Sequence, residues 1–261
     1  MSLMDKTALV TAGAEGIGRA IAQTLVREGA KVHVCDVNAE AIADINRADS
    51  DLKGTSGDVT KPADVDRVFK ETLARFGDHL DILVNNAGIA GPTGPVESLD
   101  PNGWRATFDV NLHGAFHCLQ QAVPLMKAQK SGSIVNLSSS AGLFGFPLRT
   151  PYAAAKWGVI GLTKSLAMEL GPFGIRVNAL CPGSVKGPRI DRVIAADAKS
   201  RGVKEQEIYD AYVKQVSMRS FVEAQDIAEM VAFICSPRGA MISGQALSVD
   251  GHTETLGAID L

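Results

Sequence analysis

The sequence predicts an α/β protein with a single domain built around a parallel β-sheet that carries helices on both faces. Three observations support this fold class. Short, almost continuously hydrophobic segments rich in β-branched residues recur along the chain, which is typical of strands buried on both faces of a parallel sheet. Longer segments with helical periodicity separate them, so strands and helices alternate. A length of 261 residues is compatible with one large domain.

Seven hydrophobic segments are expected to form the strands of the sheet. They are residues 7–11, 31–35, 53–59, 80–85, 133–138, 176–181 and 246–250. Helical periodicity runs between them, most clearly over residues 19–29, 62–76, 103–127 and 152–170. Strands that alternate with crossover helices form βαβ units, and such units build a doubly wound sheet.

One stretch interrupts this alternation. Residues 187–216 are polar and mainly helical, and they separate the sixth strand from the next helix of the sheet. Insertions after the carboxyl end of a strand lie over the ligand crevice in open α/β sheets. We therefore expect residues 187–216 to form a substrate lid within a single domain, 1–261.

Composition excludes several classes of function. Lys and Arg number 26 against 29 Asp and Glu, a net charge of −3, and the basic residues form no stripe of the kind that binds nucleic acid or anionic membranes. The four cysteines show no metal or redox spacing, so we expect free thiols and no metal site: Cys35, Cys118, Cys181 and Cys235. No segment has the features of a signal peptide or reaches the ~18 apolar residues of a membrane span. We expect a cytoplasmic protein that acts on a small molecule.

A glycine-rich turn follows the first strand and leads directly into a helix. It reads Thr11-Ala12-Gly13-Ala14-Glu15-Gly16-Ile17-Gly18. Glycines at such a turn let the backbone approach a pyrophosphate, whose charge the helix N-terminus stabilises. The motif alone is also compatible with a tight turn that binds nothing. The candidate dinucleotide contacts are Gly13, Glu15, Gly16, Ile17 and Gly18.

Asp36 strengthens the prediction of a dinucleotide site. It ends the second strand about 20 residues after the turn, where a carboxylate accepts hydrogen bonds from both ribose hydroxyls. Its charge, together with that of Glu15, would repel the 2′-phosphate of NADP. The alternative is that Asp36 only caps the helix that follows. Its position at the end of the strand favours the first interpretation, with NAD as the cofactor.

Tyr152 and Lys156 lie four residues apart in a helical segment and therefore share one face. Such a pair arises by chance in many helices. Here, however, the preceding strand ends in Ser138, Ser139 and Ser140. Hydroxyls at the carboxyl end of a strand stand at the mouth of the nucleotide crevice, so the pattern predicts chemistry at this edge of the sheet.

In their order along the chain, these features resemble the short-chain dehydrogenase/reductases. The motifs that carry the resemblance span nearly the whole chain and are the glycine-rich turn, Asn85-Asn86-Ala87-Gly88, Asn111, Ser139, Tyr152-x-x-x-Lys156 and Pro182-Gly183. Ser139 is chosen among the three serines because it lies thirteen residues before Tyr152, the usual spacing in that family. The resemblance implies a Rossmann fold and hydride transfer between NAD and an alcohol or ketone, with Asn111, Ser139, Tyr152 and Lys156 as the catalytic set.

Tyr152 is the expected acid/base. The ordinary pKa of tyrosine, about 10, is too high for a base at neutral pH. Lys156, with the positively charged nicotinamide, would stabilise the phenolate and lower that pKa. Ser139 would hold the substrate oxygen and stabilise the charge that develops on it. The resemblance further implies that Lys156 binds the nicotinamide ribose and that Asn111 holds a water linking Lys156 to solvent.

Other cofactor contacts follow from the resemblance alone. They are Asp58 and Val59 at the adenine, Asn86, Ala87 and Gly88 at the ribose, and Pro182, Gly183 and Val185 at the nicotinamide. Asn85 is expected to tie neighbouring strands together instead.

Three positions depart from the family pattern. The turn begins Thr11-Ala12 rather than Thr-Gly, for which we expect altered local geometry with cofactor binding retained. Gly187 stands where the family often has a threonine that bonds the carboxamide, and a backbone group or a lid side chain is expected to replace it. The last strand ends in Asp250-Gly251-His252 rather than Asp-Gly-Gly.

Two cations are candidate substrate contacts. Arg149 lies in the catalytic loop and Arg189 at the start of the lid, with Lys186 and Arg192 beside it. Such a cluster favours an anionic group on the substrate. The alternative, which the sequence favours somewhat, is a solvated lid face whose cations pair with Asp191, Asp197 and Glu205.

The polar lid favours a sugar, a polyol or a small hydroxy acid as substrate. Apolar residues between 141 and 151 leave a steroid, another apolar alcohol or a 3-oxoacyl group as alternatives. A regulatory protein that binds NAD without chemistry is the non-enzyme alternative, and the intact catalytic set speaks against it. A nucleotide-sugar epimerase would share the fold but generally has a longer C-terminal domain.

The predicted helices over residues 103–127 and 152–170 are apolar on more than one face. Helices of this kind need burial on both sides. Together with the family resemblance, this pattern predicts a homotetramer.

Overall fold

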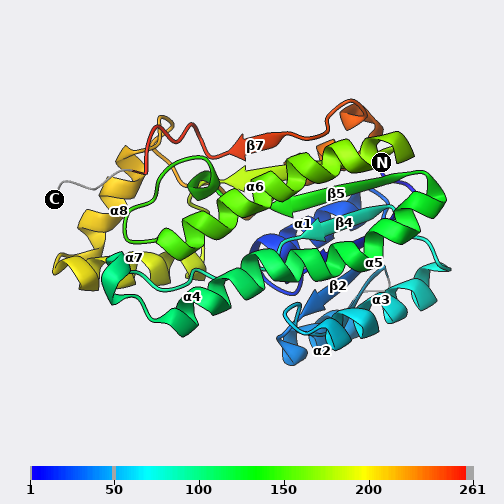
Figure 1. The fold of residues 1–261 in the computed structure, drawn as a ribbon, viewed down its shortest axis with the longest axis horizontal. Coiled ribbons are helices and arrows are strands. Elements are labelled where there is room, and N and C mark those ends of the chain that lie inside the picture. Colours follow the sequence, from blue (N-terminus) through cyan, green and yellow to red (C-terminus); the bar gives the residue numbers. More distant parts are fainter. Residues whose placement is uncertain (1, 49–50, 257–261) are drawn as a thin grey trace.

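The sheet has seven parallel strands, as the sequence predicts (Figure 1). A computed structural model describes residues 2–48 and 51–256. The strands lie in the order β3-β2-β1-β4-β5-β6-β7, and their bounds are β1 Thr7–Thr11, β2 Lys31–Asp36, β3 Leu52–Ser56, β4 Ile82–Asn85, β5 Gly132–Leu137, β6 Ile175–Pro182 and β7 Ala246–Val249. The strand order reverses between β1 and β4, and doubly wound sheets bind their ligands at such a reversal.

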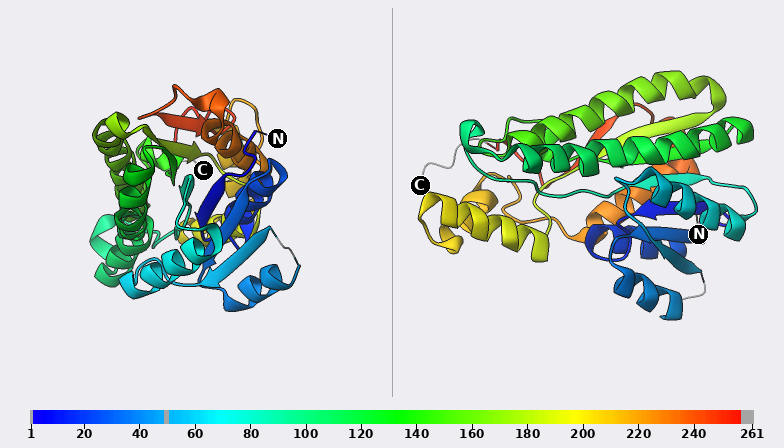
Figure 2. Two further views of the ribbon diagram at one scale, coloured as in Figure 1. Left: turned by 90° about the vertical axis from the view of Figure 1, so that its right-hand side faces the viewer. Right: turned by 60° about the horizontal axis from the view of Figure 1, so that its bottom comes forward.

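Helices cover both faces of this sheet (Figure 2). One face packs against α1 (Gly16–Arg27), α2 (Ala39–Ala48) and α9 (Ala224–Cys235). The other packs against α3 (Pro62–Phe76), α5 (Gly114–Gln129) and α6 (Thr150–Leu170). Strand β1 serves both cores, because successive side chains of a strand alternate: Ala8 and Val10 face the first core and Leu9 the second. Both faces of the sheet are thus buried. A ligand can reach the sheet only at its edge strands and at the ends of its strands.

One strand ends earlier than predicted. The segment 53–59 is a strand only as far as Ser56. The main-chain N–H and the hydroxyl of Thr60 donate to the Asp58 carboxylate at 2.9 and 2.8 Å, and such local side-chain bonds favour a turn over a strand ladder. Val59 then lies in the core, where a Cβ on Gly114 would come within 2.6 Å of it.

The helix expected over 103–127 is interrupted at Asn111. α4 (Pro101–Phe108) runs into a π-helical turn, Asp109–His113, before α5 begins. The Nδ2 of Asn111 donates to the oxygens of Ile89 and Thr107 at 3.0 and 2.8 Å, and its Oδ1 accepts from the N–H of Ile89 at 3.1 Å. These bonds hold Asn111 against the loop after β4. A widened turn inside an α-helix frequently marks a functional site, and the sequence period does not reveal it.

The insert after β6 consists of α7 (Pro188–Arg201) and α8 (Glu205–Lys214). The two helices lie beyond the carboxyl ends of the strands (Figure 1). They share a small core of their own with the β5–α6 loop, and its members are Ile194, Ala198, Ile208, Tyr212, Phe221 and the half-buried Phe146. The insert therefore packs on the loop that leads into α6.

A buried line of polar side chains fixes α6 on the sheet. The Nδ2 of Asn85 in β4 donates to the Oδ1 of Asn136 in β5 at 2.9 Å, and the Nδ2 of Asn136 donates to the Oγ1 of Thr163 in α6 at 2.9 Å. All three side chains are buried. This confirms that Asn85 ties neighbouring strands together, and it extends the tie to the helix that carries Tyr152 and Lys156.

Replacing Asn136 with alanine is expected to lower the free energy of unfolding by about 2–4 kcal/mol, because Asn85 and Thr163 would both lose a buried partner. Thr163→Val is the matched control, since it removes a single hydroxyl and should cost about 1 kcal/mol. Urea unfolding followed by circular dichroism measures both values. Equal costs for the two variants would contradict the account.

Candidate active site

The glycine-rich turn joins β1 to α1, and a residue from the next strand closes it. The Nδ2 of Asn86, directly after β4, donates to the oxygens of Thr11 and Ala12 at 3.0 Å each. A Cβ on Gly18 would lie 2.0 Å from the oxygen of Ala12, so this position requires glycine. Ala12 itself has a φ of 48°, a left-handed conformation that costs a non-glycine residue about 1–2 kcal/mol. The turn thus forms with alanine at a cost that the family's glycine avoids.

The start of α1 fits a pyrophosphate group. Among the described residues, Glu15 at the N-cap makes no side-chain capping bond, and its side chain is exposed. The first amides of the helix therefore lack a side-chain partner. A Cβ on Gly16 would meet nothing within 4 Å, so the backbone is open to an approaching group. Exposed amides at a helix N-terminus bind anions, which is what the glycine-rich turn predicts.

Asp36 lies at the carboxyl end of β2, beside this turn. Its Oδ2 accepts from the N–H of Ala14 at 3.1 Å and its Oδ1 from the N–H of Asn38 at 3.0 Å. The cap of α2 belongs to Asn38, whose Oδ1 accepts from the N–H of Ala41 at 3.1 Å. The structure therefore favours a role for Asp36 at the turn over a role as helix cap.

Of the three serines after β5, Ser138 and Ser140 are buried and Ser139 is partly exposed. The hydroxyl of Ser138 donates to the main-chain oxygen of Lys156 at 2.8 Å and holds the strand end on α6. The Oγ of Ser139 accepts from the N–H of Ala141 at 3.2 Å, which leaves its own proton for another acceptor. Exposure thus supports the choice of Ser139.

Three cations surround the ring of Tyr152. The Nζ of Lys156, one turn along α6, lies 5.7 Å from the ring centroid. The guanidinium carbons of Arg149 and Arg189 lie 5.3 and 6.0 Å from the same point. The structure therefore brings Tyr152 together with Lys156 and with both arginines predicted as substrate contacts.

These charges lower the pKa of Tyr152. Burial alone raises it, because a phenolate loses its hydration. The positive charges of Lys156 and Arg189 act in the opposite direction, with the hydrogen bond from Ser139 and the charge of Arg149. Their sum outweighs burial and holds the pKa of the phenol below its ordinary value.

Lys156 is buried, with 3% of its surface exposed. Its Nζ donates to the main-chain oxygen of Leu137, the last residue of β5, at 2.6 Å. Burial lowers the pKa of Lys156, the nearby Tyr152 raises it, and Arg189 lowers it further. The net direction is downward, so the strand end holds an ammonium group that is poorly hydrated and close to the phenol.

Asn111 meets the loop after β4 next to Lys156. A Cβ on Gly88 would lie 2.6 Å from the Oδ1 of Asn111 and 3.5 Å from the Nζ of Lys156, so glycine permits this close approach. Because the side-chain amide of Asn111 is engaged with Ile89 and Thr107, its observed effect is to position the loop that contains Gly88.

The segment after β6 returns to the same edge. The N–H of Gly183 donates to the oxygen of Val249 at 3.1 Å, and Val185 pairs with Val222 in an isolated bridge. Gly187 has a φ of 132°, which strains a β-branched residue such as threonine. Two residues later, the Nη1 of Arg189 donates to the oxygen of Gly88 at 3.2 Å. Arg189 is thus the lid side chain that borders this edge.

The cations of the lid divide into paired and unpaired groups. Lys186 pairs with Glu223, and the Nε of Arg201 lies 2.7 Å from the Oδ1 of Asp197. Within residues 2–48 and 51–256, Arg149 and Arg189 form no ion pair. The alternative in which the lid cations form ion pairs therefore holds for Lys186. It does not hold for Arg149 and Arg189, the two arginines beside Tyr152.

Sequence reasoning missed two features of the site. The clamp that Asn86 places on the turn depends on the packing of β4 beside β1, and no local pattern indicates it. The second feature is the group of buried Asp197 and Tyr212 with half-buried Arg201, in which the Tyr212 hydroxyl donates to Asp197 Oδ2 at 3.3 Å. Asp197 and Arg201 have the four-residue spacing of a helical ion pair.

Within the described residues, no cluster of three or more His, Cys, Asp or Glu side chains is arranged to hold a metal. None of the described helices is long and apolar enough to cross a membrane.

The four cysteines are unpaired and buried. His252, the departure at the last strand, lies with its Nδ1 2.6 Å from the Oγ of Ser217.

Comparisons with known proteins agree with this architecture. The profile of a family described as enoyl-(acyl carrier protein) reductase matches residues 11–252. A D-beta-hydroxybutyrate dehydrogenase of Rhizobium meliloti (strain 1021) is 34% identical over 257 residues, covering 95% of this chain and 98% of that protein. A 3-oxoacyl-[acyl-carrier-protein] reductase of Staphylococcus aureus (strain Mu50 / ATCC 700699) is 40% identical over 253 residues, covering 95% and 98%.

The solved structure of NAD⁺-bound xylitol dehydrogenase matches with a TM-score of 0.91 at 29% identity, covering 97% of this chain and all of that one. These matches span almost the whole of both partners, and the seven-stranded sheet carries each motif of the resemblance at one edge. The chain therefore belongs to the short-chain dehydrogenase/reductase family of oxidoreductases.

Proposed function

We propose that this protein transfers a hydride between NAD(H) and an alcohol or ketone, with Tyr152 as the acid/base. The observation that carries the proposal is the phenol of Tyr152, which lies among three cations and within reach of Ser139. When bound, NAD(H) would supply the hydride chemistry at the carbon that carries the substrate oxygen.

The residues of the chain handle the proton and the oxygen. As phenolate, Tyr152 accepts the hydroxyl proton of the alcohol, and as phenol it returns that proton to the ketone oxygen. Ser139 donates to the substrate oxygen and stabilises its developing charge. Lys156 stabilises the phenolate and, by family resemblance, binds the nicotinamide ribose, while Asn111 positions the loop beside it. Oxidation therefore slows as the pH falls below the pKa of Tyr152, and reduction slows as the pH rises above it.

NAD is the proposed cofactor because Asp36 and Glu15 place negative charge where NADP would carry its 2′-phosphate. The open amides at the start of α1 and the glycines that allow close approach support a dinucleotide there. The proposed contacts are Gly13, Glu15, Gly16, Ile17, Gly18, Asp36, Asp58, Val59, Asn86, Ala87, Gly88, Tyr152, Lys156, Pro182, Gly183 and Val185.

A sugar, a polyol or a small hydroxy acid is the proposed substrate class, with α7 and α8 as the lid over it. The names of the xylitol and hydroxybutyrate dehydrogenases support this class. The acyl reductase among the relatives keeps a 3-oxoacyl ketone as the alternative.

A homotetramer in the cytoplasm is the proposed state. Large apolar side chains are exposed on α5 and α6, where Phe116, Trp157 and Met168 have 48%, 52% and 83% of their surface accessible. Apolar exposure on neighbouring helices is typical of a subunit interface. The four buried free thiols suit a reducing compartment.

Tyr152→Phe is expected to lower kcat/KM by about 10²–10⁴-fold, because it removes the proton carrier and leaves the ring in place. NADH absorbance in a screen of 3-hydroxybutyrate, xylitol and simple secondary alcohols provides the assay. Tyr209→Phe, on exposed α8, is the matched control and should keep the wild-type rate. Unchanged activity in Tyr152→Phe would contradict the proposed role and revive a non-catalytic function.

The wild-type protein is expected to bind NADH about 10- to 100-fold more tightly than NADPH, since the phosphate would face a carboxylate. Asp36→Ser should reduce this ratio mainly by improving NADPH binding. Asp44→Asn, which removes a carboxylate from the exposed surface of α2, should leave it unchanged. Fluorescence titration measures each affinity, and a wild-type preference for NADPH would refute the assignment.

A further inference from the structure

Arg149 is a buried cation that forms no ion pair with any residue of the described segments, 2–48 and 51–256. It has 5% of its surface exposed, and its Nη2 donates to the main-chain oxygen of Ala90 at 2.8 Å. Its Nε is buried and has no hydrogen-bond partner among the described residues. Burying an unpaired guanidinium is costly unless something completes its hydrogen bonds. The side chain is therefore arranged for a partner that the protein itself does not supply.

Arg189 is a second arginine beside the same ring that forms no ion pair with the described residues. Arg189 begins α7, and its one described hydrogen bond is to the oxygen of Gly88. Its guanidinium and that of Arg149 lie 6.0 and 5.3 Å from the Tyr152 centroid. The catalytic loop and the lid thus each contribute one guanidinium beside the proposed acid/base.

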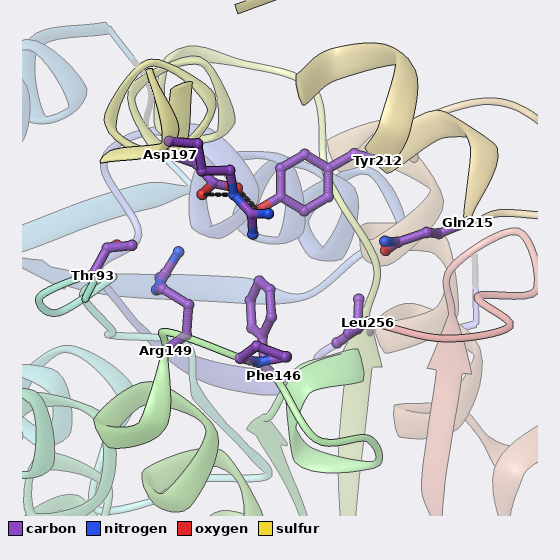
Figure 3. Close-up of a pocket in the computed structure, with 9 residues that line it drawn as sticks. Thr93, Phe146, Arg149, Asp197, Tyr212, Gln215 and Leu256 are labelled. Carbon is purple, nitrogen blue, oxygen red and sulfur yellow. Dashed lines mark hydrogen bonds and ion pairs between the residues drawn. The ribbon is translucent and has the colours of Figure 1, made fainter. Parts of the chain in front are cut away.

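The carboxylate of Asp197, which lines a hollow with Arg149, does not pair with it. Arg149 lines a small hollow together with Phe146, Asp197 and Tyr212, and Figure 3 shows the arginine below it and Asp197 above. The oxygens of Asp197 are already engaged with Arg201 at 2.7 Å and with the Tyr212 hydroxyl at 3.3 Å. Among the described residues, Asp197 therefore forms no ion pair with either arginine beside Tyr152.

We propose that Arg149 and Arg189 bind a carboxylate of the substrate and so select hydroxy acids or keto acids over neutral alcohols. This inference rests on the proposed function, whose substrate class it narrows. The planar guanidinium fork matches the two oxygens of a carboxylate, and a water-excluded site strengthens the attraction. A substrate anchored there presents its hydroxyl carbon to the neighbouring phenol of Tyr152.

The hollow encloses about 10 Å³, which is room for about one water molecule. Neither Arg189 nor Tyr152 lines this hollow, so the proposed carboxylate site is the space beside the Tyr152 ring that the two guanidinium groups border, not the hollow itself. The bond from Arg189 to Gly88 uses a single N–H of Nη1, so other donors of this guanidinium are left for a carboxylate.

Butyrate and butyramide test the proposal, because they match in shape and differ in charge. Calorimetric titration of the protein–NADH complex is expected to show butyrate binding about tenfold or more tightly than butyramide, the effect of one charge-assisted hydrogen bond. Arg149→Met and Arg189→Met should each reduce this preference, with the NADH affinity kept. Arg192→Met, one turn further along α7, should retain it.

Equal binding of the two ligands to the wild-type protein would overturn the proposal, as would a preference that survives both arginine variants. Tighter binding of inorganic phosphate than of butyrate would overturn the assignment to a carboxylate. If Arg149→Met fails to fold, Arg189→Met and Arg149→Lys, which keeps the charge and loses the fork, decide the question. If the protein binds no NADH, the proposed function is refuted. The butyrate titration without cofactor then still tests whether the two arginines bind a carboxylate.

Discussion

The positive charge around the phenol of Tyr152 is the interaction on which the rest of the site depends. Burial pushes the phenol toward its neutral form, and a neutral phenol cannot accept the proton of an alcohol. Lys156, Arg189 and Arg149 oppose burial, and their combined effect lowers the pKa of the phenol. Since each cation is also close to another, the arrangement is costly by itself. The phenolate and a substrate carboxylate, both anionic, would offset this repulsion when they lie beside the cations.

The fold creates this concentration of positive charge because it brings segments distant in sequence to the carboxyl ends of the strands. Lys156 is held by the last carbonyl of β5, and its helix is fixed to β4 and β5 through Asn85, Asn136 and Thr163. Asn86 clamps the glycine-rich turn, and Asn111 braces the next loop from a widened helical turn. Side-chain amides thus fix the orientation of these segments through directional hydrogen bonds. Apolar contacts hold segments together without fixing their orientation in this way.

The sheet and the shared face of Tyr152 and Lys156 could be predicted from sequence, since strand hydrophobicity and four-residue spacing are local signals. The choice of Ser139 among three serines depended on the family resemblance. The end of β3 and the break at Asn111 could not, because Asp58 and Asn111 form bonds that compete with regular structure. In the alternative interpretation of the lid, Asp191, Asp197 and Glu205 pair with its cations. Asp197 instead pairs with Arg201 within α7, a choice that depends on which helix face the β5–α6 loop covers. The unpaired state of Arg149 follows from that packing.

Ionisation of Tyr152 tests the central claim most directly. The chain has three tyrosines, and burial raises the pKa of Tyr212 to about 12, so the ultraviolet difference between wild type and Tyr152→Phe isolates one phenolate. We predict a midpoint below the ordinary tyrosine value of about 10, shifted upward in Lys156→Met. A midpoint at or above that value, or one that Lys156→Met leaves unmoved, would contradict the account.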